Sequence, residues 1–128
     1  MLLTEYLTDI NQTIAAYIQT GLIVSSDVIS DIRTDNIGLL KGVISFWDGS
    51  TLFFKEYLDL RYHLDKKTYS FHYQDDRAVL RLRYDNADHK PDLGVKDHKH
   101  TPGDIRSATI PNLYDVLGEI VNTYLTEQ

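Results

Sequence analysis

Apolar residues near both ends of the chain recur at three- and four-residue intervals, the spacing of one face of an α-helix. The first set is Leu3, Leu7, Ile10, Ile14 and Ile18. Gly21 follows this set as a natural helix stop. A second set of apolar residues repeats on one helical face of residues 112–125. The pattern therefore predicts one amphipathic helix at each end of the chain.

Between the two helices the apolar period changes to two, which is typical of strands with one buried face. We expect strands at 24–33, 37–47, 51–64, 68–74 and 78–84, followed by a long loop over 86–111. Short turns such as Asp48-Gly49 favour sequential antiparallel pairing. The predicted fold is a single α+β domain over residues 1–128, an antiparallel meander of about five strands with both helices packed on one face.

Length and composition narrow the class of protein. A domain of 128 residues buries enough core to fold without a disulfide or a metal, and the absence of Cys excludes thiolate zinc sites and thiol nucleophiles. No apolar run is long enough to span a membrane, and the N-terminus lacks the basic region of a signal peptide, so we expect a cytoplasmic protein with no membrane partner. The net charge of −6 disfavours broad attraction to nucleic acid but permits a local basic patch.

The alternation assigns a polar set of side chains to the sheet face that the helices leave open. This set is Lys55, Tyr57, Asp59, Arg61, His72, Gln74, Arg81, Arg83 and Asp85. A polar, solvated face is ordinary in an antiparallel sheet. A mixture of His, Arg and Tyr, however, also provides the groups that acid–base chemistry and anion binding require.

Glu56 does not fit the alternation. It has the phase of Leu52, Phe54 and Leu58, which places an ionisable carboxylate among the buried positions, where it is costly without a partner. Two interpretations are open. A β-bulge turns Glu56 outward, or Glu56 is a buried acid with a function.

Three short segments concentrate the chemically active residues. They are Tyr-Ser-Phe-His-Tyr-Gln at 69–74, Arg-Tyr-Asp-Asn-Ala-Asp-His-Lys-Pro at 83–91 and His-Lys-His at 98–100. These segments resemble the TumE-type family, small proteins described as toxin components of bacterial and archaeal toxin–antitoxin pairs, and residues 52–57 agree more loosely. The chain departs from the family pattern at Asp88, where Pro is usual, and at Lys90, where a second His is usual. The resemblance implies a toxin directed at RNA, in the manner of RelE-like toxins, with a cognate antitoxin as its partner.

Cleavage of RNA without a metal needs a base for the 2′-hydroxyl, a cation for the phosphorane charge and an acid for the leaving oxygen. The candidate catalytic residues are His72 as base, Arg83 as phosphate-binding cation, Asp85, and His89 or His100 as acid. The candidate RNA-binding residues are Lys55, Tyr57, Arg61, Tyr73, Arg81 and Asn86, of which the two tyrosines are suited to stacking on a base. Asp85 and Asn86 equally suit a strand-ending Asx turn.

Two further alternatives follow from the same residues. His98 and His100 could bind a metal together with Asp97 or His89, but these residues lack an ordered ligand spacing, so we expect no metal and no cofactor. A non-catalytic interaction module is the alternative to a ribonuclease, and it would bind a protein partner through the polar sheet face and the 86–111 loop. A homodimer also remains open.

Overall fold

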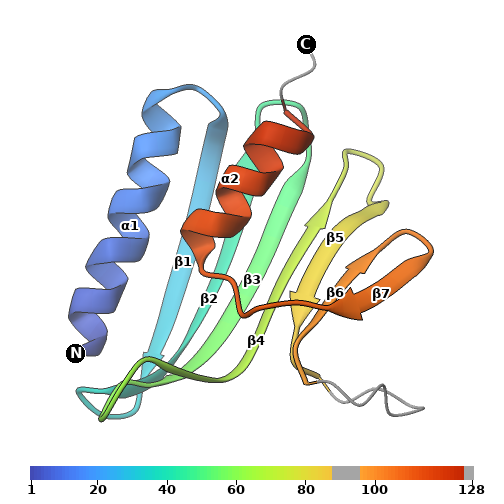
Figure 1. The fold of residues 1–128 in the computed structure, drawn as a ribbon. Helices are drawn as coiled ribbons and strands as arrows, with labels where there is room; N and C mark the ends of the chain where they lie inside the picture. Colours follow the sequence, from blue (N-terminus) through green and yellow to red (C-terminus); the bar gives the residue numbers. More distant parts are fainter. Residues whose placement is uncertain (88–95, 126–128) are drawn as a thin grey trace.

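Two helices and seven strands make up the computed structural model, which describes residues 1–87 and 96–125. In chain order they are α1 (Leu3–Gln19), β1 (Ile23–Ile32), β2 (Ile37–Phe46), β3 (Thr51–Asp59), β4 (Asp65–Gln74), β5 (Leu80–Asp85), β6 (His98–Thr101), β7 (Asp104–Ser107) and α2 (Leu113–Thr123). The strands form one antiparallel sheet whose spatial order follows the sequence (Figure 1). The predicted fold class is confirmed. No helix in the described part of the chain is long and apolar enough to cross a membrane.

The expected number of strands was wrong, because the sheet has seven and not five. The additional strands β6 and β7 form a hairpin inside the predicted 86–111 loop, closed by Pro102-Gly103. Gly103 has a φ of +77°, the left-handed conformation that a type II turn requires after its proline. Each of these strands has only four residues and most of them are polar, so they carry almost no period-two signal.

Two strand boundaries also differ from the prediction. The strand expected over 51–64 ends at Asp59, and β4 already begins at Asp65. β5 begins at Leu80 and not at residue 78, because Ala78 has a φ of +63° and belongs to the turn.

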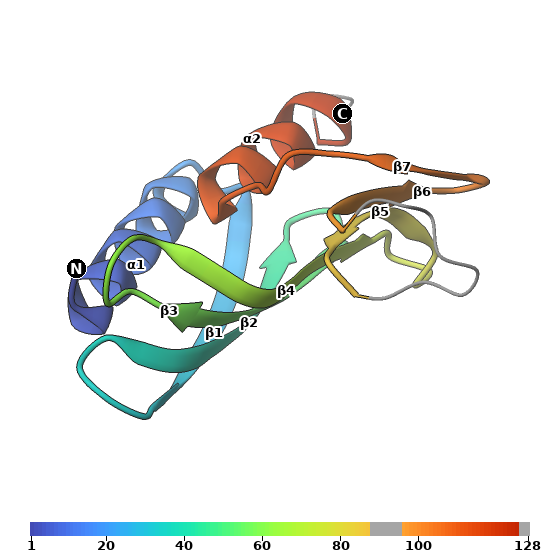
Figure 2. The same cartoon turned by 60° about the horizontal axis from the view of Figure 1, so that its bottom comes forward.

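Both helices pack on the same face of the sheet, as predicted (Figure 2). The backbone N–H of Gly21, which has a φ of +80°, donates to the carbonyl of Ile18 just after the end of α1. Asn112 caps the start of α2, where its side chain accepts a hydrogen bond of 2.7 Å from the backbone N–H of Asp115. Local sequence signals thus set the two helix ends.

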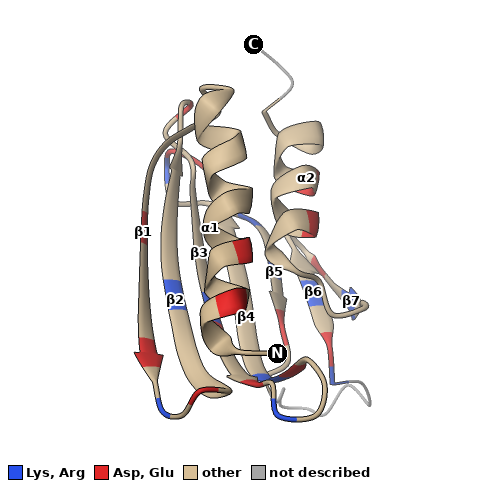
Figure 3. Cartoon of the chain, turned by 90° about the vertical axis from the view of Figure 1, so that its left-hand side faces the viewer, with Lys and Arg blue, Asp and Glu red and all other residues tan. Residues whose placement is uncertain are grey.

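Charge is unevenly divided between the helices and the sheet. The charged residues of the helices are Glu5 and Asp9 in α1 and Asp115 and Glu119 in α2, so all four are acidic (Figure 3). The lysines and arginines of the described chain therefore lie in the strands and their connections. The helix layer is the acidic side of the molecule.

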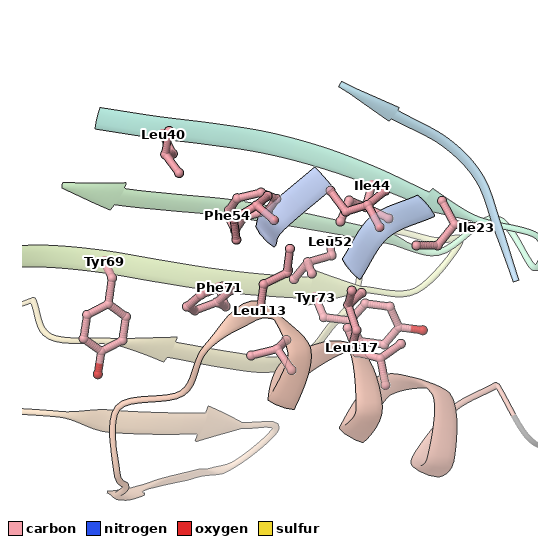
Figure 4. Close-up of a cluster of buried hydrophobic side chains, with 14 of the residues drawn as sticks. Ile23, Leu40, Ile44, Leu52, Phe54, Tyr69, Phe71, Tyr73, Leu113 and Leu117 are labelled. Atoms are coloured by element: carbon pink, nitrogen blue, oxygen red, sulfur yellow. The ribbon is translucent and has the colours of Figure 1, made fainter. Parts of the chain in front are cut away.

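The hydrophobic core lies between the sheet and the two helices (Figure 4). Leu52 and Phe71 from the sheet and Leu117 from α2 are fully buried in it. Gly42 allows the ring of Phe54 to lie over β2, because a Cβ at position 42 would come within 2.1 Å of that ring. The predicted alternation matches the buried set on β3 up to Tyr57, but Asp59, which was assigned to the open face, is buried after the bulge between Tyr57 and Leu58.

Glu56 points into this core and is paired there. A bulge does follow it, between Tyr57 and Leu58, but it does not turn Glu56 outward. Glu56 is fully buried, its Oε2 lies 2.6 Å from the Nζ of Lys66, and its Oε1 accepts a hydrogen bond of 2.7 Å from the hydroxyl of Tyr6. Burial, together with the Glu56 carboxylate, raises the pKa of Tyr6. The Nζ of Lys66 also donates to the carbonyl of Pro111 at 2.7 Å.

Replacing Lys66 by Met should lower the free energy of unfolding by about 3–5 kcal/mol, because Glu56 would remain as an uncompensated buried charge. The double variant Glu56→Leu/Lys66→Met should recover much of this loss, since it leaves no isolated charge inside. Urea unfolding followed by circular dichroism measures both effects.

The control for this experiment is Lys67→Met. Lys67 is the next residue, but its side chain is 52% exposed and pairs with Asp65 at the surface. A surface pair contributes little to stability, so this variant should unfold like the parent protein. Equal losses for the Lys66 and Lys67 variants would show that the buried pair has no special role.

Candidate functional site

The strand register brings one residue from each strand into a line across the open face of the sheet. This line, the first row, is Asp27, Val43, Phe53, His72, Arg83, His100 and Ile105. The neighbouring line, the second row, is Ile29, Lys41, Lys55, Ser70, Asp85, His98 and Ser107. Four of the five candidate catalytic residues fall within these two rows on β4, β5 and β6. The fifth, His89, lies outside the described residues.

Arg83 lies at the centre of this group. Its Nη1 is 3.3 Å from the Nδ1 of His72, and its Nε donates to Oδ2 of Asp85 at 2.7 Å. A guanidinium can only donate, so Nδ1 of His72 accepts and Nε2 carries the proton. Nε2 is 3.1 Å from Oε1 of Gln74, which accepts from it. These contacts orient the His72 ring so that Nδ1 faces Arg83.

Asp85 connects the arginine to the two histidines of β6. Its side chain is only 6% exposed although it faces the open side of the sheet. Its Oδ1 lies 3.5 Å from Nε2 of His100 and 3.8 Å from Nδ1 of His98. A carboxylate at this position orients the imidazole beside it and balances the charge of Arg83.

Asn86 has a structural position at the end of β5. Its Oδ1 accepts from the backbone N–H of Tyr69 at 3.1 Å, and its Nδ2 donates to the carbonyl of Lys67 at 3.0 Å. The side chain thus joins β4 to the residue that follows β5. Of the Asp85-Asn86 pair, Asn86 supports the strand end, whereas Asp85 belongs to the polar cluster.

The remaining candidate RNA-binding residues are divided between accessible and inaccessible positions. Lys55 and Tyr57 lie on the open face, as expected. Tyr73 does not, because it is only 1% exposed on the helix side and its hydroxyl donates to Ser50 at 2.8 Å. Stacking of Tyr73 on a base is therefore excluded in this structure.

The other two candidate arginines are exposed but lie outside the cluster. Arg61 follows the end of β3 and donates to both carboxylate oxygens of Asp59, and these hydrogen bonds lower the pKa of Asp59 to about 2. Arg81 donates to Asp75 in the β4–β5 turn at 3.0 Å. Neither arginine contacts the residues around Arg83 among the described interactions.

A hollow of about 400 Å³ opens on the same face beside His72 and Arg83. Its lining also includes Asp27, Ile29, Lys41, Val43, Phe53, Lys55 and Ser70. Of these further lining residues, the sequence predicted only Lys55 as part of the site. The missing signal was the register of the β2–β3 hairpin, which sets Lys41 opposite Lys55.

Within residues 1–87 and 96–125, no group of three or more His, Asp or Glu residues is arranged to hold a metal ion. His98 and His100 both face Asp85, with their ring centroids 6.2 Å apart. The expectation of a metal-free site stays a prediction for elemental analysis.

Comparison with known proteins identifies the family. No curated protein and no solved structure matches the chain significantly. A family model described as Toxin TumE matches residues 12–127, most of the chain. The resemblance of the His, Arg and Asp-rich segments is thereby confirmed, and the chain belongs to the TumE toxin family.

Proposed function

We propose that this chain is a toxin that cleaves RNA without a metal, at a site centred on Arg83. The TumE family is a family of toxins, and a toxin of a toxin–antitoxin pair has an antitoxin as its partner. The ribonuclease activity goes beyond the family assignment and rests on the geometry of the open face.

The observation that carries the proposal is the order His72, Arg83, His100 on three neighbouring strands. In-line cleavage of RNA needs a base and an acid on opposite sides of a phosphate that a cation holds. Adjacent strands lie about 4.8 Å apart, so a phosphate bound at Arg83 is within reach of an imidazole on either side.

Each residue then has a definite task. His72 accepts the proton of the 2′-hydroxyl at Nδ1 once the phosphate takes over the Nη1 donor of Arg83. The 2′-oxygen attacks phosphorus to form a 2′,3′-cyclic phosphate, Arg83 stabilises the charge on the phosphorane, and the 5′-oxygen leaves with a proton from His100. Asp85 is a positioning residue that holds Arg83 and His100. His89 is the alternative acid.

A non-catalytic interaction module is the competing function. It is favoured by the exposed apolar side chains of the open face, among them Ile29 and Val43, which are 60% and 40% exposed. A binding module would not need the two histidines beside Arg83. Their substitution therefore separates the two functions.

His72→Ala and His100→Ala should each lower RNA cleavage by about 10²- to 10⁴-fold, because each removes a proton-transfer group. The readouts are cleavage of RNA by purified protein and growth arrest on induced expression, with thermal melts to check folding. His63→Ala is the matched control, since His63 is an exposed histidine outside the cluster. If the His72 and His100 variants melt like the parent and still arrest growth, the catalytic assignment is wrong.

Arg83 requires a different substitution. Its side chain is 36% exposed and pairs with the buried Asp85, so Arg83→Ala would leave that carboxylate without its cation and destabilise the fold. Arg83→Lys keeps the charge but loses the two-donor geometry. This variant should remain folded and lose most of its activity, whereas full activity would show that a simple point charge is sufficient.

The absence of a metal requirement gives an independent test. Cleavage should be unchanged in excess EDTA, and the products should end in a 2′,3′-cyclic phosphate, because the 2′-hydroxyl is the nucleophile. A substrate with 2′-deoxyribose at the cleaved position should resist the protein completely. Stoichiometric zinc or manganese in the purified protein, together with loss of activity on chelation, would contradict the mechanism.

A further inference from the structure

Lys41 and Lys55 lie directly opposite each other on β2 and β3, and both line the hollow on the open face. Neither forms an ion pair with another residue in the described part of the chain. Like charges directly opposite each other across an antiparallel pair repel and destabilise the sheet. An anion bound between the two ammonium groups would remove that repulsion.

An exposed aromatic ring borders the same hollow. Phe53 is 40% exposed, and its ring centroid lies 6.2 Å from that of His72 at an angle of 59°. The ring of Phe53 is thus partly accessible next to the proposed base. Aromatic rings beside lysines are the arrangement by which proteins bind single-stranded nucleic acid, with a base on the ring and phosphates on the cations.

Asp27 gives the first row of the hollow a negative charge that the second row lacks there. It ends the first row on β1, beyond Val43 and Phe53, and it lines the hollow. Its carboxylate repels a phosphate but accepts a hydrogen bond from the N–H groups of a base. The base therefore suits the first row, and the phosphate suits the lysines of the second row.

We propose that this hollow is a nucleotide subsite for single-stranded RNA. The base next to the cleaved phosphate stacks on Phe53, and the phosphate that flanks it is bound by both Lys41 and Lys55. A volume of about 400 Å³ suits one nucleotide and lies within the usual range of ligand sites. The inference rests on the proposed function for the position of the cleaved phosphate, but binding at the subsite requires no cleavage.

Binding is measured with a fluorescein-labelled, single-stranded RNA of mixed sequence that is 2′-O-methylated throughout. This probe has no free 2′-hydroxyl, so it reports binding whether or not the protein is a ribonuclease. Phe53→Ala should raise the Kd by about 5- to 150-fold, the usual loss for one stacked base, and Phe53→Trp should retain binding. Lys41→Gln/Lys55→Gln should weaken binding and reduce the slope of log K against log salt by about 0.7, the value for one phosphate contact on a single strand.

Arg106→Gln is the control for charge. Arg106 lies opposite Lys99 in the β6–β7 register, and the side chain of Lys99 pairs with Glu119 of α2, so both point to the helix side. The substitution removes one positive charge from the far face of the sheet. Binding and its salt dependence should stay at the parent values.

Lys55→Glu separates ligand binding from damage to the fold. It places opposite charges across β2 and β3, and the β4 residue opposite position 55 is the neutral Ser70, so the melting temperature should rise by about 1–4 °C while the probe binds more weakly. A role of Lys55 in folding alone would instead predict a lower melting temperature.

The possible results distinguish the subsite from the ribonuclease. If the Phe53 and lysine variants bind the probe as tightly as the parent, the subsite is wrong, even where the parent cleaves RNA. If the parent binds the probe through these residues but cleaves no RNA, the subsite stands and the ribonuclease proposal fails. If the parent does not bind the probe, the subsite is wrong.

Discussion

Lys66 and Glu56 lie in the interior, where neither charge would be stable without the other. Glu56 comes from β3 and Lys66 from β4, while Tyr6 of α1 and the carbonyl of Pro111, just before α2, complete their contacts. The pair therefore specifies how both helices lie on the sheet. Apolar contacts alone would tolerate sliding of a helix along the core, whereas such a slide would separate these hydrogen-bonded atoms and leave buried polar groups without partners.

The position of this network has a consequence for the opposite face. The interior of the helix side is filled by apolar side chains and the buried Glu56–Lys66 pair, while the partly exposed Lys99 and Glu119 on this side pair with each other. The second carboxylate-centred cluster, around Asp85, faces the other way and contains two histidines besides Arg83. Glu56 thus supports the fold, whereas Asp85 lies where a ligand can reach the groups that it holds.

The sequence was sufficient for features that depend on local pattern. Periodicities of 3.6 and 2 predict the two helices, the single sheet face that both helices cover, and the common phase of His72 and Arg83. Tyr73 shows the limit of residue type as a guide, because it has the phase of Phe71, and this phase placed it inside. The partner of Glu56 could not be predicted. Lys66 lies just after the connection between β3 and β4, and the periodicity of the sequence does not fix the length of that connection.

Features that depend on cross-strand register were harder to predict. β6 and β7 are too short for a period, and without them His100 has no defined neighbour. Lys41 became a candidate only when the Asp48-Gly49 turn fixed which residue of β2 faces Lys55. The position of each strand in the sheet depends on every turn and bulge before it. An error in one turn therefore shifts the predicted register of all later strands.

The distribution of charge is compatible with the proposed binding of RNA to an acidic protein. A net charge of −6 repels a polyanion at long range, and both helices contribute to that repulsion. Salt largely screens this repulsion beyond about 10 Å, so the local charges dominate once the RNA is close to the surface. Lys41, Lys55 and Arg83 line one hollow on the open face together with Asp27, and the charge of Asp85 beside them is balanced by Arg83. RNA would therefore bind through a few close contacts on this face, and affinity would depend on those contacts more than on overall attraction.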